Sequence, residues 1–363
     1  MCQQLMLKRI LIVCCLPVVL AGLFVYSHGH ASAEGYTEKV FWAGYNQVTV
    51  VNPAVPEIVA SIKIKGPARD MSFTEDGKKG LFLGNGRTTL YVVDTVQNKV
   101  IDEINLSGRT DTGLLDRRVF GSTISPDGTK AYAFVTQGEK QVNRYKLLPS
   151  KILEIDLKTK EVLRSTEAPY GVHVLQFNLE HPGKILVWGY DLYTLDVKEM
   201  KLTLTHGIKH PEKPEDGSTN MLLLFPRDRE SNMNIAPVIT SYPDGRVIEG
   251  ILWYDFKTEK LKTVAFDKEP VGMFSAVSNL ERTHAYVIMN HWYKVDMKTG
   301  HVIKDIYPPT GTIYDMNMSA DGKKLYLGGG GNDFIIADMD MNVQKILKMP
   351  TDGWNMKVVR VKN

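Results

Sequence analysis

One pair of histidines has a spacing that could bind a metal. His206 and His210 are four residues apart, the spacing at which two imidazoles on one face of a helix hold a metal ion. Gly207 and Pro211 disfavour a helix at this place, and the acidic residues that follow are typical of a solvated loop. A metal site stays open as the alternative, and the residue types favour the loop.

The glycine run Gly328–Gly331 is a second candidate, because such a run can cradle a phosphate. It follows a strand-like stretch (KLYLG), but another strand-like stretch (FIIAD) follows it, so no helix N-terminus is available to bind an anion. We therefore expect a tight connection between two strands. The sequence also lacks the Gly-x-Ser-x-Gly elbow, the His-Glu-x-x-His zinc motif and the Walker phosphate loop.

Seven acidic or amide residues resemble catalytic groups but recur too regularly for that role. Each ends an apolar, β-rich stretch: Asn52, Asp94, Asp156, Asp196, Asp255, Asp296 and Asp338. Their spacings are 42, 62, 40, 59, 41 and 42 residues, and four of these match the period of roughly 40–50 residues found in propeller blades. The two long intervals contain insertions around Thr136–Ser150 and His206–Asn220. The recurrence assigns the seven side chains to turns and predicts seven blades.

Each repeat contains strands rather than helices. β-branched and aromatic residues alternate on both sides of short polar turns, and Asp-Gly turns such as Asp76-Gly77, Asp127-Gly128 and Asp321-Gly322 precede several of the seven residues. Four strands per repeat give an all-β fold, a seven-bladed β-propeller of four-stranded antiparallel blades. A plain β-sandwich is the alternative, and the seven-fold period disfavours it.

The two ends of the repeat array complement each other. Only three strands are predicted before the first long connection: Val40–Ala43, Gln47–Val51 and Ile58–Ile64. An unpartnered β-rich run, Asn355–Val361, follows the last repeat. This C-terminal run can join the first blade and close the ring, which would remove an exposed sheet edge.

The N-terminus has the order of a secretory signal peptide. Lys8 and Arg9 precede the apolar run Ile10–Tyr26, and Ala31–Ala33 supplies small residues for cleavage. We therefore expect a signal peptide at 1–33, cleavage near Ala33, a propeller domain at 34–363 and a periplasmic location. The alternative is an uncleaved anchor, because the apolar run approaches the length of a membrane span.

All three cysteines, Cys2, Cys14 and Cys15, lie in this segment. Residues 34–363 can therefore form no disulfide, thiolate nucleophile or covalent haem attachment, and we expect no cofactor in this chain. The formal net charge of +3 falls by two when Lys8 and Arg9 are removed. No basic excess remains to bind nucleic acid or, after signal cleavage, a membrane surface.

In a propeller, residues at the start of each innermost strand line the mouth of the central channel. We expect this rim to contain Arg69, Phe120, Tyr170, Phe274, Tyr314 and Trp354. Aromatic and arginine side chains gathered at one rim suit the docking of a partner. The alternative, of equal weight, is that they only fill the tapering channel.

Several stretches resemble the β subunit of quinohaemoprotein amine dehydrogenase. They are Phe120-Gly121-x-x-x-Ser125-Pro126-Asp127-Gly128 with the insertion that runs to Pro149, Ile155-Asp156, Phe274–Val277, and Tyr314 through Asp321-Gly322 to Gly329. The resemblance extends over residues 34–363 in blade order. Methylamine dehydrogenase heavy chains and YVTN-type propellers share the architecture.

The resemblance implies a periplasmic heterotrimer. Its β subunit is a cofactor-free propeller, its small γ subunit carries cysteine tryptophylquinone, and its α subunit is a dihaem cytochrome c. Primary amines are oxidised at the quinone, and the electrons pass to haem. No catalytic, cofactor-binding or metal-binding residue of this chain is implied, because the chemistry of that family is on the γ subunit.

Three functions compete. The first is a non-catalytic subunit that scaffolds the γ and α partners, and the second is a free-standing exported propeller that binds a protein or glycan. The third is a propeller enzyme, such as a metal-dependent lactonase or a quinone-dependent dehydrogenase. The third needs carboxylates and histidines that converge at the channel mouth, and the predicted strand starts contain no such cluster.

Overall fold

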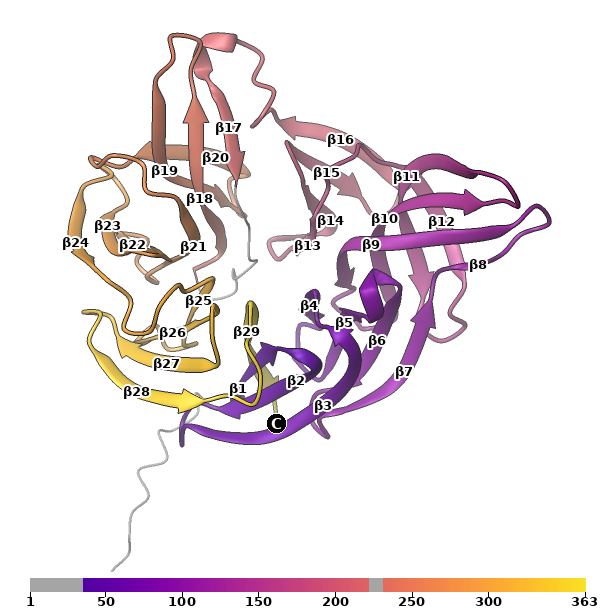
Figure 1. The fold of residues 1–363 in the computed structure, drawn as a ribbon, viewed down its shortest axis with the longest axis horizontal. Helices are drawn as coiled ribbons and strands as arrows, with labels where there is room; N and C mark the ends of the chain where they lie inside the picture. The colour runs from indigo at the N-terminus through magenta and orange to yellow at the C-terminus, as the bar shows by residue number, and fades with distance from the viewer. Residues whose placement is uncertain (1–34, 222–230) are drawn as a thin grey trace, which may run out of the picture.

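The chain folds into a ring of seven β-sheets around a central channel (Figure 1). The computed structural model describes residues 35–221 and 231–363, so the predicted signal peptide, its cleavage site and the three cysteines lie outside the described residues. All seven sheets are antiparallel, and the architecture is the predicted seven-bladed β-propeller. No helix in the two described ranges is long and apolar enough to cross a membrane.

In each blade the strands follow one another from the channel outward. Blade 1 contains β29 (Asn355–Lys362), β1 (Tyr36–Ala43), β2 (Tyr45–Asn52) and β3 (Glu57–Pro67). Blade 2 contains β4 (Asp70–Phe73), β5 (Lys79–Gly84), β6 (Thr89–Asp94) and β7 (Lys99–Asn105). Blade 3 contains β9 (Leu114–Ile124), β10 (Lys130–Lys140), β11 (Tyr145–Asp156) and β12 (Val162–Glu167). Blade 4 contains β13 (Val174–Asn178), β14 (His181–Trp188), β15 (Leu192–Asp196) and β16 (Lys201–His206).

Three blades complete the ring. Blade 5 contains β17 (Ser218–Met221), β18 (Met233–Ser241), β19 (Val247–Asp255) and β20 (Lys260–Ala265). Blade 6 contains β21 (Met273–Ser278), β22 (His284–Met289), β23 (Trp292–Asp296) and β24 (Val302–Ile306). Blade 7 contains β25 (Asp315–Met318), β26 (Lys324–Gly328), β27 (Asp333–Asp338) and β28 (Val343–Lys348). Two single-turn 3₁₀ helices, η1 (Asn85–Arg87) and η2 (Pro214–Asp216), lie in connections.

Blade 3 differs from the expected four strands by one short addition. The strand β8 (Gly108–Arg109) pairs with Leu114 and Leu115 of β9 and makes this sheet five-stranded. It has only two residues and no apolar alternation, which is why the sequence pattern did not predict it.

The C-terminal strand closes the ring as predicted. β29 pairs antiparallel with β1 from Tyr36 opposite Lys362 to Ala43 opposite Asn355. Apolar side chains seal the joint, since Trp42 of blade 1 is buried edge-on against Phe334 of blade 7, with ring centres 6.0 Å apart. The same buried cluster includes Met356 of β29, so the two chain ends share one core.

The seven recurring residues lie in turns, as predicted. Each ends the third strand of its blade, and its side-chain oxygen accepts backbone N–H groups of the following turn. Asp156, for example, accepts the N–H groups of Lys158 and Thr159, both at 2.8 Å. Lys160 then adopts a positive φ of 65°, which reverses the chain into the fourth strand. These seven side chains are structural.

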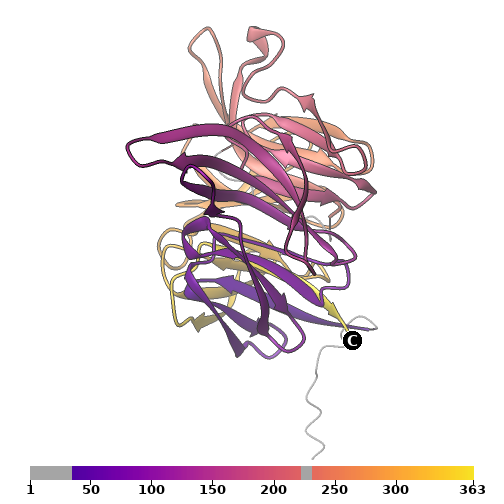
Figure 2. The ribbon, with the colours of Figure 1, turned by 90° about the vertical axis from the view of Figure 1, so that its right-hand side faces the viewer.

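Strand direction alternates within each blade, so two kinds of connection share one face of the ring. They join strand 2 to strand 3 and one blade to the next, and we call this side the mouth face. The first insertion lengthens the β10–β11 hairpin, and the second forms the blade 4-to-5 connection with η2. Figure 2 shows the purple hairpin of blade 3 projecting on the side opposite the C-terminus. Both insertions therefore enlarge the mouth face.

Candidate functional site

Four of the six predicted rim residues directly precede or open an innermost strand. Arg69, Tyr314 and Trp354 come immediately before β4, β25 and β29, and Phe274 is the second residue of β21. Phe120 lies within the longer strand β9. Tyr170 lies four residues before β13. His173 instead occupies the position directly before this strand, since its backbone N–H donates to the Trp188 carbonyl as that of Arg69 donates to the Leu83 carbonyl before β4.

Five of these residues take part in three ring contacts around the mouth. The Phe274 and Tyr314 rings lie 5.3 Å apart. The guanidinium carbon of Arg69 lies 5.0 Å from the ring centre of Trp354, whose indole N–H donates to the Ala68 carbonyl at 2.7 Å. These contacts join blades 6 to 7 and 1 to 2.

The third contact brings in a residue that sequence reasoning missed. The guanidinium carbon of Arg87, in η1, lies 4.5 Å from the ring centre of Phe120 on blade 3. The signal in the sequence is the turn Asn85-Gly86-Arg87 after a strand, which predicts a tight connection but not where its arginine points. Tyr170 stands apart from these contacts with 72% of its surface exposed.

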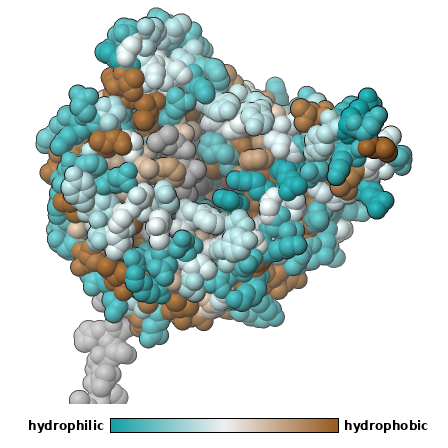
Figure 3. All heavy atoms as spheres, in the orientation of Figure 1, coloured by the Kyte–Doolittle hydropathy of each residue, from teal (hydrophilic) through white to brown (hydrophobic). Residues whose placement is uncertain are grey.

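The rim aromatics are half-buried rather than enclosed. Phe120, Phe274, Tyr314 and Trp354 each keep an intermediate share of their surface open to solvent. Figure 3 shows the mouth face, with hydrophilic side chains over the region that β9 occupies in Figure 1. Open aromatic surface with charge beside it can serve recognition, and burial of these rings by a partner stays a prediction.

A buried carboxylate holds the second insertion in place. Asp191 lies after β14 and accepts the N–H groups of Ile208, Lys209 and His210 at 2.8, 3.0 and 3.1 Å, together with Nδ1 of His210 at 2.8 Å. Burial favours the neutral acid, but the hydrogen bonds from His210 and the backbone outweigh it, and the pKa of Asp191 is lowered. The sequence did not predict these hydrogen bonds between Asp191 and the insertion.

His206 and His210 do not converge on one point. Nε2 of His206 lies 3.2 Å from the Glu259 carbonyl, whereas Nδ1 of His210 faces Asp191. The segment is a loop after β16, as the residue types favoured. Within the described residues, no group of three or more His, Cys, Asp or Glu side chains is placed to hold a metal ion. The run Gly328–Gly331 joins β26 to β27, as expected.

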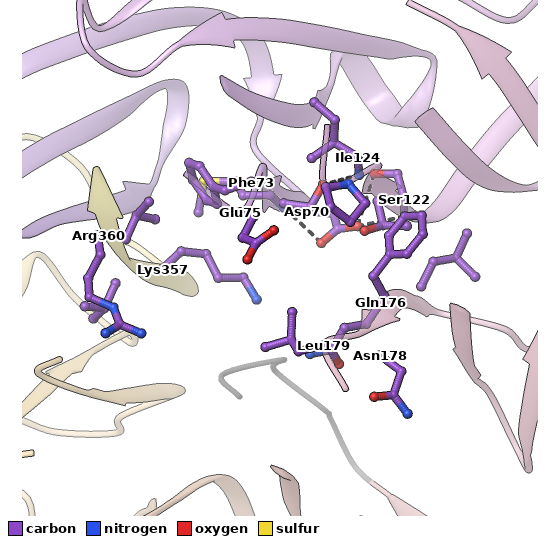
Figure 4. Close-up of a pocket in the computed structure, with 18 of the residues that line it drawn as sticks. Asp70, Phe73, Glu75, Ser122, Ile124, Gln176, Asn178, Leu179, Lys357 and Arg360 are labelled. Carbon is purple, nitrogen blue, oxygen red and sulfur yellow. Dashed lines mark hydrogen bonds between the residues drawn. The ribbon is translucent and has the colours of Figure 1, made fainter. Parts of the chain in front are cut away.

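A cavity of about 460 Å³ with a mixed polar and apolar lining lies inside the channel (Figure 4). The side chains that face it include Asp70, Ser122, Gln176, Asn178 and Lys357. Asp70 Oδ2 accepts the Ser122 N–H at 2.8 Å and lies 3.2 Å from its hydroxyl, and Lys357 is 8% exposed. Burial raises the pKa of Asp70, although the Lys357 charge and the Ser122 hydrogen bonds oppose the shift.

The carboxylates of the channel link neighbouring blades. Asp315 Oδ2 accepts the Met356 N–H at 2.5 Å and so links blade 7 to blade 1. Asp70 links blade 2 to blade 3 in the same way through the Ser122 N–H. Ser275 Oγ accepts the Met316 N–H at 3.1 Å in the same way. Because these oxygens are engaged with backbone, the described geometry favours a structural role for them.

Comparison with known proteins shows the fold. No family model and no curated protein matches the chain. A chain of hydrazine synthase from Kuenenia stuttgartiensis is 14% identical with a TM-score of 0.55, covering 85% of this chain and 90% of that one. AztD from Citrobacter koseri is 13% identical with a TM-score of 0.52, covering 90% and 99%. The dihydro-haem d1 dehydrogenase NirN is 13% identical with a TM-score of 0.55, covering 89% and 75%.

Proposed function

We propose that this chain is the non-catalytic β subunit of a periplasmic quinohaemoprotein amine dehydrogenase. In this role it binds a small γ subunit that carries cysteine tryptophylquinone and a dihaem cytochrome c α subunit. The propeller positions the two partners, and the partners carry the redox groups for oxidative deamination of primary amines.

The observation that carries the proposal is the construction of the mouth face. Part of this face contains half-buried aromatic side chains, on blades 1, 3, 6 and 7, and two arginines on blade 2. The two insertions, in the blade 3 hairpin and in the connection from blade 4 to blade 5, enlarge it. The blade 3 hairpin carries Val142 and Leu147 almost fully exposed, at 103% and 81%. These two side chains are available for contact with a partner.

The sequence supports the division of labour. Residues 34–363 contain no cysteine, so a thioether-crosslinked quinone or a c-type haem in this complex must be attached to another chain. Two structures of similar fold are named as a hydrazine synthase and a dihydro-haem d1 dehydrogenase. A role beside nitrogen and haem chemistry agrees with those names.

Purification of the natively expressed, affinity-tagged chain from its periplasm tests the proposal. We expect a haem-absorbing subunit and a small quinone-modified subunit to co-elute with it, and the complex to reduce a dye when a primary amine is added. A double variant, Val142→Glu with Leu147→Glu, should weaken co-elution without unfolding the propeller. A colourless monomer that captures neither subunit would overturn the proposal.

The alternative is a free-standing exported propeller that binds a protein or glycan, and the exposed hairpin tip agrees with it as well. The same purification separates the two functions. The alternative predicts a partner without haem or quinone that is lost in the Val142→Glu, Leu147→Glu variant.

A further inference from the structure

Two arginines and two aromatic rings form a row across blades 1, 2 and 3 at the channel mouth. Its order around the ring is Trp354, Arg69, Arg87 and Phe120, and each guanidinium lies over the neighbouring aromatic ring at 5.0 and 4.5 Å. Stacking on a ring fixes the plane of a guanidinium and leaves its edge available for hydrogen bonds.

The two arginines lie on neighbouring backbone segments. Arg69 donates its backbone N–H to Leu83 near the end of β5 at 2.7 Å, and η1 leads from that end directly to Arg87. Burial lowers the pKa of Arg87, and the positive charge of Arg69 lowers it further. Like charges on neighbouring side chains repel one another, so an anion bound between them would relieve the repulsion.

The donors of this pair are largely unused. Across residues 35–221 and 231–363, no carboxylate lies within ion-pair distance of either guanidinium, and the Arg69 guanidinium has no hydrogen-bond acceptor. Within the described residues, the Arg87 side chain donates one hydrogen bond, from Nη1 to the Val119 carbonyl, and this bond is long at 3.3 Å. Arg69 is exposed, so a ligand can reach the pair from solvent.

The backbone of η1 is strained at Arg87. Asn85, Gly86 and Arg87 have φ angles of 48°, 62° and 70°, all in the left-handed region. This conformation costs about 1–2 kcal/mol for a residue with a Cβ, and strain of this kind gathers at binding sites. Glycine would fit more easily at position 87, so stability of the turn does not account for the arginine.

We propose that Arg69 and Arg87 form a carboxylate-binding site at the channel mouth. Planar guanidinium groups match the two oxygens of a carboxylate with paired N–H···O bonds. A guanidinium pairs with phosphate as well, so phosphate is the competing anion. Burial lowers the pKa of His173 and keeps its ring uncharged, so it adds no positive charge. The carboxylate comes from a free organic acid or from an acidic segment of another protein, and the site stands without the proposed function.

The test titrates residues 34–363 of the chain with three probes: succinate, a hexaglutamate peptide and inorganic phosphate. The readout is tryptophan emission, because Trp354 lies under Arg69 and should respond to an anion there, and Trp354→Phe identifies its share. We expect saturable binding of the peptide or of both carboxylate probes, with phosphate weaker. Arg69→Gln and Arg87→Gly should each weaken it about tenfold or more, since a charge-assisted pair of hydrogen bonds is lost.

Arg87→Gly keeps the turn conformation, and thermal melts verify the fold of each variant. Arg246→Gln is the matched control, because Arg246 also stacks on a ring, that of Tyr242 at 4.6 Å, but already pairs with Asp244 at 2.6 Å. Binding by the peptide alone assigns the site to an acidic protein segment, and binding by both probes assigns it to free carboxylates. No binding of either carboxylate, tighter binding of phosphate, or unchanged affinity in both variants would overturn the proposal.

Discussion

Removal of the C-terminal strand is the sharpest test of how the ring is held closed. Deleting residues 355–363 removes β29, which is the innermost strand of blade 1 and pairs with all eight residues of β1. Met356, Val359 and Val361 on this strand are 1%, 4% and 4% exposed. Burial of each such side chain contributes about 1.5–3 kcal/mol, so the deletion loses about 5–9 kcal/mol before any hydrogen bond is counted.

That loss is comparable with the whole free energy of unfolding of a typical domain, about 5–15 kcal/mol. We therefore expect the truncated chain to melt far below the parent or to remain unfolded, and to aggregate through the freed edge of β1. Far-UV circular dichroism melts and size-exclusion chromatography measure both effects. A synthetic peptide of residues 355–363, added during refolding, should restore part of the melting temperature because it can re-occupy the strand position.

Point variants calibrate the deletion. Val361→Ala should cost about 1–2 kcal/mol, since two buried methyl-sized groups are lost. Val343→Ala on β28 removes the same groups from a side chain that is 41% exposed and should change stability by about 0.5 kcal/mol at most. A monomeric truncated chain with the melting temperature of the parent would show that β29 does not close the ring energetically.

Three further predictions follow from the mouth face, the insertion and the sequence. Phe274→Ala or Tyr314→Ala should weaken association with a partner by about 1–3 kcal/mol, with much less effect on the melting of the isolated chain; full assembly of Phe274→Ala, or normal assembly without turnover, would contradict this. Asp191→Asn should cost about 1–3 kcal/mol near neutral pH in urea unfolding. Because the pKa of Asp191 is lowered in the folded state, its carboxylate stabilises the fold above about pH 4 and loses this effect as the pH falls further. The free energies of unfolding of the parent and of Asp191→Asn should therefore converge in acid. Thiol titration of the denatured, exported protein should give zero, and a detected thiol would mean that Cys2, Cys14 or Cys15 was retained.

The sequence determines the blades because the signals for them are local. Each recurring Asp or Asn binds the N–H groups of the two to four residues after it, so the motif and its structure lie within one turn. Ring closure was also predictable, because it needs only the count of strands at each end. The pairing of β29 with β1 joins distant segments, but the missing strand at one end and the unpartnered strand at the other leave one way to complete the ring.

The site was less predictable because its contacts join distant segments. Arg87 stacks on a ring 33 residues away, and Asp191 binds a loop that begins 17 residues after it. Nothing in the local sequence distinguishes Arg87 from other arginines in turns, and its role depends on a positive φ that residue type does not predict. Tyr170 shows the same limit, since a shift of three residues at the start of β13 places His173 in the equivalent position.

Near the rim residues, side-chain hydrogen bonds link the innermost strands of neighbouring blades. Ser275 binds the Met316 N–H, Asp315 binds the Met356 N–H, and Asp70 binds the Ser122 N–H, which links blades 6 to 7, 7 to 1 and 2 to 3. Between blades 1 and 2 the link is made by the rim itself, because the Trp354 indole donates to the Ala68 carbonyl. The rim residues therefore sit on strands whose relative positions are fixed before any partner arrives. A surface held in this way loses little conformational entropy on binding, so its few aromatic and arginine side chains can be effective anchors.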